Sequence, residues 1–368
     1  MLIKNYKKIV IKIGSTTIVN QLSGKLKTKW LNSICEDIAQ IENLNKKIAI
    51  VSSGAIALGR KLFSNHKQIK RLEDKQAAAA IGQIELAKHW QQAFKKYSIH
   101  TAQLLLTLND SEERRRYLNV RKTITSLHNK KVIPIINEND TVATEEIRYG
   151  DNDRLAARVA QMIGADLLIL LSDIDGLYTE NPNISKQATR VNNIQMIDET
   201  IEKMAGKNKS IVGSGGMKTK IWAAKICLNS GCSTVIANGK KFNPLNKINE
   251  TNSTWFISKS SPNIARKQWL LNHLHPSGTA IIDDGAVNAL INNKSLLSAG
   301  VIEIKGRFNR GDIITVNNKK NKKIAIGVVA YNSNDARKIL GKKSKDIIKI
   351  LGYETRNELI HKDDLVKV

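Results

Sequence analysis

The sequence contains few of the residues that mark several common classes of protein. Its three cysteines, Cys35, Cys227 and Cys232, match no zinc-ligand spacing, and we expect them to be reduced thiols that serve packing. Aromatic residues make up 5% of the chain, too few for a base-stacking platform. No apolar run approaches the roughly 18 residues needed to cross a bilayer, and the first residues lead into a strand pattern without a signal peptide. These absences predict a cytoplasmic protein that makes no membrane contact.

Acidic residues are also scarce, since 59 lysines and arginines stand against 33 aspartates and glutamates, a net charge of +26. A basic face that binds nucleic acid would produce this balance. A compositional drift toward lysine, asparagine and isoleucine on every solvated surface would produce it as well. We favour the drift, because the lysines are spread along the chain and Lys/Asn-rich segments such as 317–323 resemble loops.

Several catalytic signatures are missing. The P-loop spacing G-x-x-x-x-G-K-[ST] does not occur, and neither does the G-x-S-x-G nucleophile elbow. The seven histidines form no cluster with cysteines or acids at metal-ligand spacing. We therefore expect no protein-held metal site, and any phosphate chemistry must be assembled from separate segments.

Two glycine-containing stretches, 12–15 and 213–220, each place a lysine beside backbone amides that can approach a polyphosphate. Phosphoryl transfer depends mostly on positioning and charge neutralisation, which Lys12 and Lys220 would supply from two sides. The alternative is structural: Lys12 as an edge-strand lysine and Lys220 as an exposed residue at a helix start. The spacing alone leaves both interpretations open.

Residues 1–260 alternate between strand and helix patterns. Apolar runs such as 8–13 and 48–51 are separated by helical stretches near 30–44 and 75–97. This alternation predicts an α/β fold with a mostly parallel sheet sandwiched by helices, in which ligands bind beyond the carboxyl ends of the strands. The polar segments that follow four predicted strands are expected to share one rim: 14–15, 52–54, 137–140 and 172–173.

Three polar segments of this chain each allow a structural and a functional interpretation. Residues 137–140, Asn-Glu-Asn-Asp, follow a buried strand, and burying so many polar groups is costly unless they meet a polar ligand. Residues 150–153 either cap the helix predicted over 154–164 or bind an amino-acid substrate and orient the two lysines. Ser172 and Asp173 either meet a nucleotide or begin a tight Asp-Gly turn.

After residue 260 the pattern changes to short strands with glycine turns, over 278–282, 300–304, 311–316 and 324–330. Together with a helix around 284–290, this pattern predicts a small C-terminal β-barrel.

Taken together in order, these segments resemble the amino-acid kinase family, and in particular its glutamate kinases. The resemblance covers essentially the whole chain and rests on six segments: 10–15, 51–56, 136–140, 150–153, 172–178 and 213–220. Residues 278–330 resemble a PUA domain, with 285–287 and 305–312 carrying the likeness. The expected parts are an amino-acid kinase domain (1–258), a linker (259–276), a PUA-like domain (277–354) and a C-terminal tail (355–368).

The resemblance implies ATP-dependent phosphorylation of the glutamate γ-carboxylate, the first step of proline biosynthesis. It implies that Lys12 and Lys220 are catalytic and that Asp153 holds them in place. It assigns glutamate binding to Ser53, Asp140 and Asn152. It assigns ATP binding to Lys12, Ser172, Asp173, Ser214, Gly215, Gly216, Met217, Lys218, Thr219 and Lys220, with Mg²⁺ mainly on the phosphates.

A carboxylate is already a nucleophile at neutral pH, so this reaction needs no general base. The family also suggests a homo-oligomer (dimer or tetramer), feedback inhibition by proline and RNA as a partner of the PUA-like domain. Two alternatives stay open: an RNA-binding protein in which the basic barrel is the active part, and another acyl-phosphate-forming kinase, such as an aspartate kinase.

Overall fold

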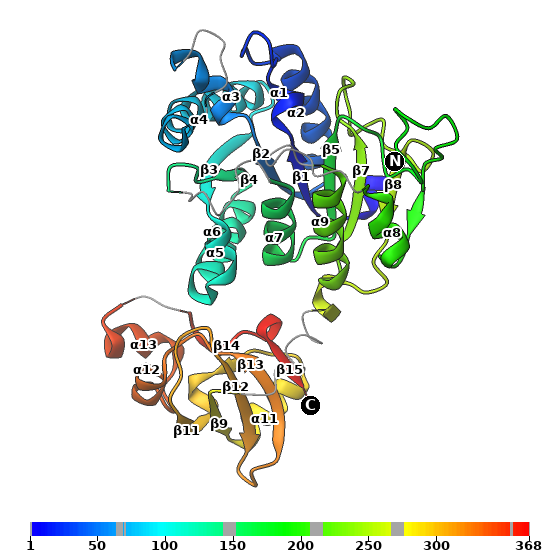
Figure 1. Cartoon of the computed structure of the whole chain (residues 1–368). Coiled ribbons are helices and arrows are strands. Elements are labelled where there is room, and N and C mark those ends of the chain that lie inside the picture. Colours follow the sequence, from blue (N-terminus) through cyan, green and yellow to red (C-terminus); the bar gives the residue numbers. More distant parts are fainter. Residues whose placement is uncertain are drawn as a thin grey trace. The chain divides into compact units, whose positions relative to one another are not determined.

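The computed structural model of the chain describes residues 2–63, 69, 71–142, 152–206, 216–265, 276–353 and 356–367 (Figure 1). The chain divides into two compact units, Met1–Pro262 (unit 1) and Asn263–Val368 (unit 2), each with its own core. Among the helices that the structure describes, none is both long and apolar enough to span a membrane.

Unit 1 is built on an eight-stranded sheet in the order β3-β4-β2-β1-β5-β7-β8-β6. The strands are β1 (Lys8–Ile13), β2 (Lys47–Ser52), β3 (His100–Leu106), β4 (Val132–Glu138), β5 (Leu167–Ser172), β6 (Asn193–Ile194), β7 (Ser233–Asn238) and β8 (Ser253–Phe256). All neighbouring strands pair in parallel except β7 and β8, which are antiparallel. The prediction of a mostly parallel sheet is therefore confirmed.

Helices cover both faces of this sheet (Figure 1). On one side lie α1 (Ser15–Ile18), α2 (Thr28–Glu42), α3 (Ala55–Gly59) and α4 (Leu72–Lys95), and on the other α5 (Leu108–Glu112), α6 (Arg114–Asn129), α7 (Asn152–Ile163), α8 (Glu199–Met204) and α9 (Met217–Asn229). Short 3₁₀ turns, Leu2–Asn5 and Arg60–Leu62, complete the unit.

The alternation of side chains along β1 determines the face of the sheet on which Lys12 lies. Ile9 and Ile11 belong to the core formed with α2 and α4, whereas Val10 belongs to the core formed with α7 and α9. Successive side chains of a strand point to opposite faces. Lys12 therefore shares the face of Val10 and points toward α7 and α9.

Unit 2 combines a five-stranded sheet, in the order β11-β9-β12-β13-β15, with a two-stranded sheet of β10 and β14. Its elements are β9 (Gly278–Ile282), α11 (Asp284–Ile291), β10 (Leu296–Leu297), β11 (Val301–Gly306), β12 (Ile313–Asn318), β13 (Lys323–Val328), α12 (Ser333–Lys338), α13 (Ser344–Leu351), β14 (Glu358–Ile360) and β15 (Leu365–Lys367), with 3₁₀ turns at Ser298–Gly300 and Lys362–Asp364. Both sheets contribute to one core, which includes Ile282, Ile314 and Ile360.

The end of the chain differs from the expectation of a tail. β14 pairs with β10, and β15 pairs with β13 through Ala325–Lys367, Ile326–Val366 and Gly327–Leu365. Residues 356–367 are thus part of the folded unit 2. The two strands are only three residues long each, which is too short to give a clear alternation in the sequence.

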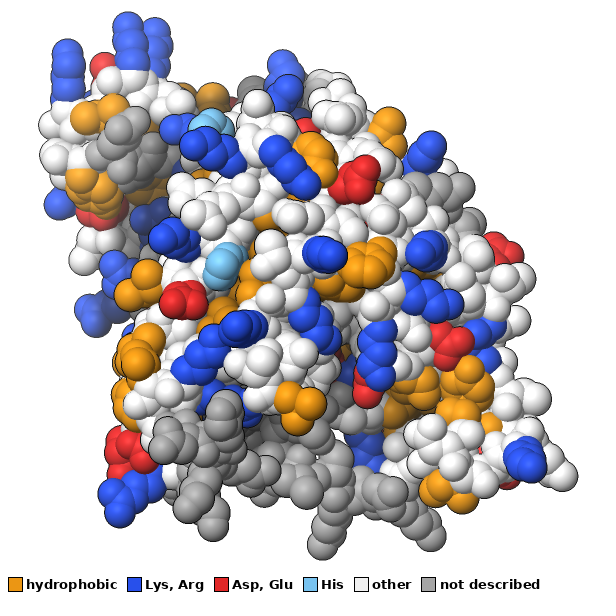
Figure 2. All heavy atoms as spheres, turned by 90° about the horizontal axis from the view of Figure 1, so that it is seen from above, with side chains coloured by type: hydrophobic (Ala, Val, Ile, Leu, Met, Phe, Trp, Pro, Cys, Tyr) orange, Lys and Arg blue, Asp and Glu red, His pale blue; other side chains and the backbone are white. Residues whose placement is uncertain are grey.

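Charged side chains show no single concentrated stripe on the face seen in Figure 2, where lysines and arginines stand among uncharged groups and a few acids. A solvated surface with a drift in composition has this appearance, whereas a nucleic-acid-binding face gathers its cations.

The contact between α3 and α4 fixes one wall of the rim. A Cβ atom on Gly59 would lie 1.9 Å from the carbonyl oxygen of Ala78, and one on Gly82 would lie 1.9 Å from that of Ala55. The two helices therefore touch through their backbones, and any side chain here would force them apart. Gln83 follows Gly82 directly, so this close approach also sets the position of Gln83 on α4.

We expect Gly82→Ala to lower the free energy of unfolding by about 1–3 kcal/mol or more, because the added methyl group overlaps the backbone of α3. Urea denaturation of the full chain measures the change. Ala80→Ser, on the exposed side of the same helix, is the matched control and should cost less than about 1 kcal/mol. Equal losses in both variants would contradict the proposed backbone contact.

Candidate active site

Two lysines from distant parts of the sequence meet on one carboxylate. Asp153, in the first turn of α7, places Oδ1 2.6 Å from Nζ of Lys12 and Oδ2 3.0 Å from Nζ of Lys220. Lys12 comes from the carboxyl end of β1 and Lys220 from the first turn of α9. The alternative, in which Lys12 lies on an edge strand and Lys220 is exposed at a helix start, is wrong, because β1 lies inside the sheet and both lysines are buried.

All three groups are buried. The side chain of Asp153 is 0% exposed, that of Lys12 7% and that of Lys220 6%. Burial by itself raises the pKa of the Asp153 carboxyl, but the charges of Lys12 and Lys220 outweigh it and, with hydrogen bonds, hold this pKa at about 2. The carboxylate thus stays ionised at neutral pH, and the cluster of two ammonium groups and one carboxylate carries a net positive charge.

The start of α9 adds further groups that can bind an anion. Thr219 Oγ1 lies 2.8 Å from Asp153 Oδ2 and 2.8 Å from the carbonyl oxygen of Gly216, the residue that caps the helix. The N–H groups of a first helical turn attract phosphate oxygens. Gly14 lies directly beside the cation of Lys12, since a Cβ atom on it would be 3.7 Å from Nζ.

A chain of buried hydrogen bonds crosses the rim from α7 to α4. The amide nitrogen of Asn152 donates to Ser53 Oγ (2.7 Å) and to Asn137 Oδ1 (3.0 Å). The amide nitrogen of Asn137 donates in turn to Gln83 Oε1 (2.7 Å). Two buried atoms of this amide chain, Asn152 Oδ1 and Gln83 Nε2, find no hydrogen-bond partner in the part of the molecule that the structure describes.

Asp140 follows β4 at the same rim and is 8% exposed. No described residue offers its carboxylate a hydrogen bond or an ion pair, and burial raises its pKa to about 6. A buried carboxylate without a counter-ion is costly, so a cationic group of a ligand would stabilise it.

The described members of the predicted nucleotide-binding set lie at the carboxyl ends of β1 and β5 and at the start of α9. Ser172 ends β5, the strand beside β1, and its hydroxyl donates to Asp173 Oδ1 at 3.1 Å. Met217 and Lys218 open α9, with Lys218 exposed to solvent. Ser214 and Gly215 lie outside the described residues.

Gln83 is the site residue that the sequence analysis missed. It lies in an alanine-rich helix whose composition suggests packing only, and its contact with Asn137 joins residues 54 positions apart. A lone glutamine on such a helix gave no sequence signal of its own.

Helices α7 and α9 also touch through an aromatic ring. The guanidinium carbon of Arg154 lies 4.6 Å, and that of Arg158 5.7 Å, from the centre of the Trp222 ring. Such cation–π contacts are worth roughly 0.5–2 kcal/mol each. They tie together the two helices that carry Asp153 and Lys220.

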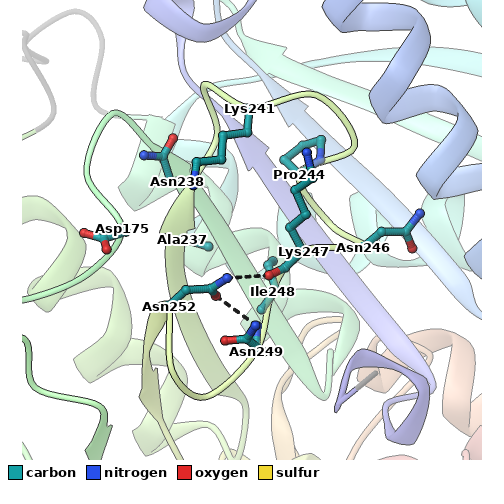
Figure 3. A pocket seen from close by; sticks show the side chains of 10 residues that line it. All are labelled: Asp175, Ala237, Asn238, Lys241, Pro244, Asn246, Lys247, Ile248, Asn249 and Asn252. Atoms are coloured by element: carbon teal, nitrogen blue, oxygen red, sulfur yellow. Dashed lines mark hydrogen bonds between the residues drawn. The ribbon is translucent and has the colours of Figure 1, made fainter.

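A separate pocket of about 450 Å³ opens beyond the carboxyl end of β7 (Figure 3). It is lined by Asp175, Ala237, Asn238, Lys241, Pro244, Asn246, Lys247, Ile248, Asn249 and Asn252. Asn252 donates to the carbonyl oxygen of Lys247 and accepts from the backbone of Asn249, so its amide shapes the loop. Ala237 and Ile248 belong to the core on the α2 side, the face of the sheet opposite Lys12.

Comparison with known proteins shows the family of this chain. Residues 7–238 match the amino acid kinase family, and residues 278–351 match the PUA domain. The chain therefore belongs to the amino acid kinase family and has a PUA domain C-terminal to the kinase region in the sequence.

The similarity to individual relatives is closer still. The chain is 51% identical over 362 residues to a glutamate 5-kinase of Rhizobium johnstonii, covering 98% of this chain and 93% of the relative. It is 52% identical over 369 residues to a glutamate 5-kinase of Pelagibacter ubique, covering the whole of both chains. Within the amino acid kinases, the chain thus belongs with the glutamate 5-kinases.

Among solved structures, a carbamate kinase from Giardia lamblia bound to AMP-PNP aligns with a TM-score of 0.51 at 15% identity, covering 70% of this chain and 100% of that one. At this identity the likeness shows the fold of unit 1 alone.

We expect Asp153→Asn to lower the free energy of unfolding by about 3–5 kcal/mol at pH 7, because two buried ammonium groups lose their counter-ion. The folded-state pKa of Asp153 is depressed to about 2, so its stabilising effect is full above the unfolded-state pKa near 3.8 and disappears as the pH falls through 2. Denaturation at several pH values should show the gap between variant and wild type closing in acid. A gap that is constant with pH would rule out this electrostatic role.

Asp140→Asn should have the opposite effect on the unliganded protein. The folded-state pKa of Asp140 is raised from 3.8 to about 6, so this group favours folding most below pH 3.8, and that contribution is lost as the pH rises through 6. At pH 7 the neutral amide should therefore raise the free energy of unfolding, by at most about 3 kcal/mol. Thermal melts at pH 7 and pH 4 measure the difference, which should be small at pH 4. A destabilised variant at pH 7 would contradict the assignment.

Proposed function

We propose that the protein transfers the γ-phosphoryl group of ATP to the γ-carboxylate of L-glutamate, giving γ-glutamyl phosphate and ADP, the first step of proline biosynthesis. The observation that carries this proposal is the pair of buried lysines on Asp153. Sequence identity of 51–52% over nearly the full length to glutamate 5-kinases of Rhizobium johnstonii and Pelagibacter ubique supports the choice of substrate.

In the proposed mechanism, a γ-carboxylate oxygen attacks the γ-phosphorus as the bond to the bridging oxygen of ADP breaks. Charge spreads over the phosphoryl oxygens in this transition state, and ammonium groups on two sides lower its energy. Lys12 and Lys220 take these positions. Asp153 keeps both in place without neutralising the pair completely.

The acceptors at the rim suit the amino group of the substrate. Among the described residues, the buried carboxylate of Asp140 has no counter-ion and the buried side-chain oxygen of Asn152 has no hydrogen-bond donor. An ammonium group bound between them would satisfy both. Ser53, which already accepts from Asn152, completes the proposed glutamate subsite.

The nucleotide is proposed to lie over the ends of β1 and β5 and the start of α9, on the residues assigned to it above. Mg²⁺ is proposed as a component of the nucleotide. Both oxygens of Asp153 already face lysines, so the donors that suit the ion are phosphate oxygens, and it would neutralise charge there.

The proposal also includes four properties for which the structure provides no direct observation. They are a homo-oligomer, proline as an inhibitor, RNA bound by the PUA domain and a cytoplasmic location, which suits the three buried free thiols. Gel filtration, turnover with added proline, and salt-dependent RNA binding test the first three directly.

We expect Lys220→Ala to reduce glutamate-dependent acyl phosphate formation by roughly 100-fold or more, because a cation that faces the transferred phosphoryl group is lost. Trapping γ-glutamyl phosphate with hydroxylamine measures the product, with aspartate in parallel to test the rival aspartate kinase. Lys225→Ala, further along the same helix and paired with Glu202 at the surface, is the matched control and should keep normal turnover. Normal hydroxamate formation by the Lys220 variant, or turnover of aspartate in preference to glutamate, would overturn the proposal.

A further inference from the structure

Gln83 presents an unexplained polar atom beside the proposed glutamate subsite. Its side chain leaves α4 at the rim and is buried, with the residue 7% exposed. Oε1 accepts from Asn137, but Nε2 has no hydrogen-bond partner among the described residues. Buried amide donors without partners are rare in native proteins, and each one requires a reason. A bound ligand that supplies an acceptor is such a reason.

The order of donors and acceptors along the chain of amides determines which atom of the Gln83 side chain has no partner among the described residues. Asn152 uses both hydrogens of its amide nitrogen, one for Ser53 and one for Asn137. Asn137 must then turn its oxygen to Asn152 and its nitrogen to Gln83. Gln83 accepts this hydrogen bond with its side-chain oxygen, so its NH₂ group faces away from the chain of amides. One end of the chain thus offers a donor, Gln83 Nε2, and the other an acceptor, Asn152 Oδ1.

This arrangement complements a zwitterion. The acceptor end, together with the carboxylate of Asp140, suits an ammonium group, and the donor end suits a carboxylate. Asn152 is next to Asp153, which holds the lysine pair, whereas Gln83 lies two hydrogen bonds further along. The carboxylate that receives the phosphoryl group must lie at the lysines. The carboxylate at the Gln83 end is therefore the other one, attached to the α-carbon.

We propose that Gln83 is a specificity-determining residue, whose Nε2 donates a hydrogen bond to the α-carboxylate of the amino-acid substrate. This inference rests on the proposed function and names one further contact of the same site. Through Asn137 and Asn152, the same bond ties recognition of the α-carboxylate to the position of α7. A dicarboxylate without an amino group keeps this contact, whereas a γ-amino acid without the α-carboxylate loses it.

The test replaces the donor and keeps the rest of the amide chain. Gln83→Glu has the same shape and still accepts from Asn137, but it turns an oxygen instead of an NH₂ group toward the substrate. The KM for glutamate should rise roughly 10- to 100-fold, the loss of a hydrogen bond to a charged group, with kcat changed less than about threefold. Gln91→Glu, exposed on the same helix, adds the same charge and should leave both constants unchanged.

Two competitive inhibitors separate recognition from general damage. Glutarate lacks the amino group of glutamate, and 4-aminobutyrate lacks its α-carboxylate. The Ki of glutarate should rise by the same factor as the KM for glutamate, while that of 4-aminobutyrate should stay the same. Gln83→Met keeps the volume without adding charge, but it also removes the acceptor of Asn137. It should raise the KM for glutamate at least as much as Gln83→Glu does, and it serves if the Glu variant has a lowered melting temperature.

An unchanged KM for glutamate, or an equal rise for all three ligands, would overturn the proposal, as would a loss confined to kcat. Failure of the proposed function has a different signature, because the wild-type protein itself would then form no hydroxamate from glutamate.

Discussion

One buried carboxylate organises the chemistry of this protein. Asp153 touches two ammonium groups that are 208 positions apart in the sequence (220 − 12), and no one of the three groups is stable in the interior alone. Two buried cations without an anion would repel each other, and a buried anion without a cation would take up a proton. The carboxyl end of β1, the start of α7 and the start of α9 must therefore come together for the site to exist. Because one carboxylate serves two lysines, excess positive charge remains for a phosphate chain.

Much of this arrangement could be predicted from the sequence, because the signals are local. The strand at 8–13 ends in Lys-Ile and is followed by Gly14, and alternation along it places Lys12 on the face of the sheet that α7 covers. The rule that ligands gather at the carboxyl ends of parallel strands brought the polar segments after four strands to one rim. The strand pattern after residue 277 likewise predicted β9 and α11, which begin at the expected residues 278 and 284.

Other features depend on contacts that no local pattern encodes. The antiparallel strand β8 is four residues long, the edge strand β6 has two residues, and the strands at the end of the chain have three each. Gln83 reaches the rim only because Gly59 and Gly82 let two helices meet through their backbones. Gln83 Nε2 and Asn152 Oδ1 lack a partner among the described residues, and this follows only from the positions of the other groups of the amide chain. The roles of Ser214 and Gly215 stay predictions, since these residues lie outside the described part of the chain.

The stack of Arg154 and Arg158 on Trp222 has a practical consequence. The emission of an indole depends on the charges around it, and here two guanidinium groups of α7 lie close to a ring of α9. Trp222 follows Lys220 by two positions, and Arg154 follows Asp153 directly. The protein contains five tryptophans, so a variant that keeps Trp222 alone would report changes in the spacing between these helices through its fluorescence, without any added dye.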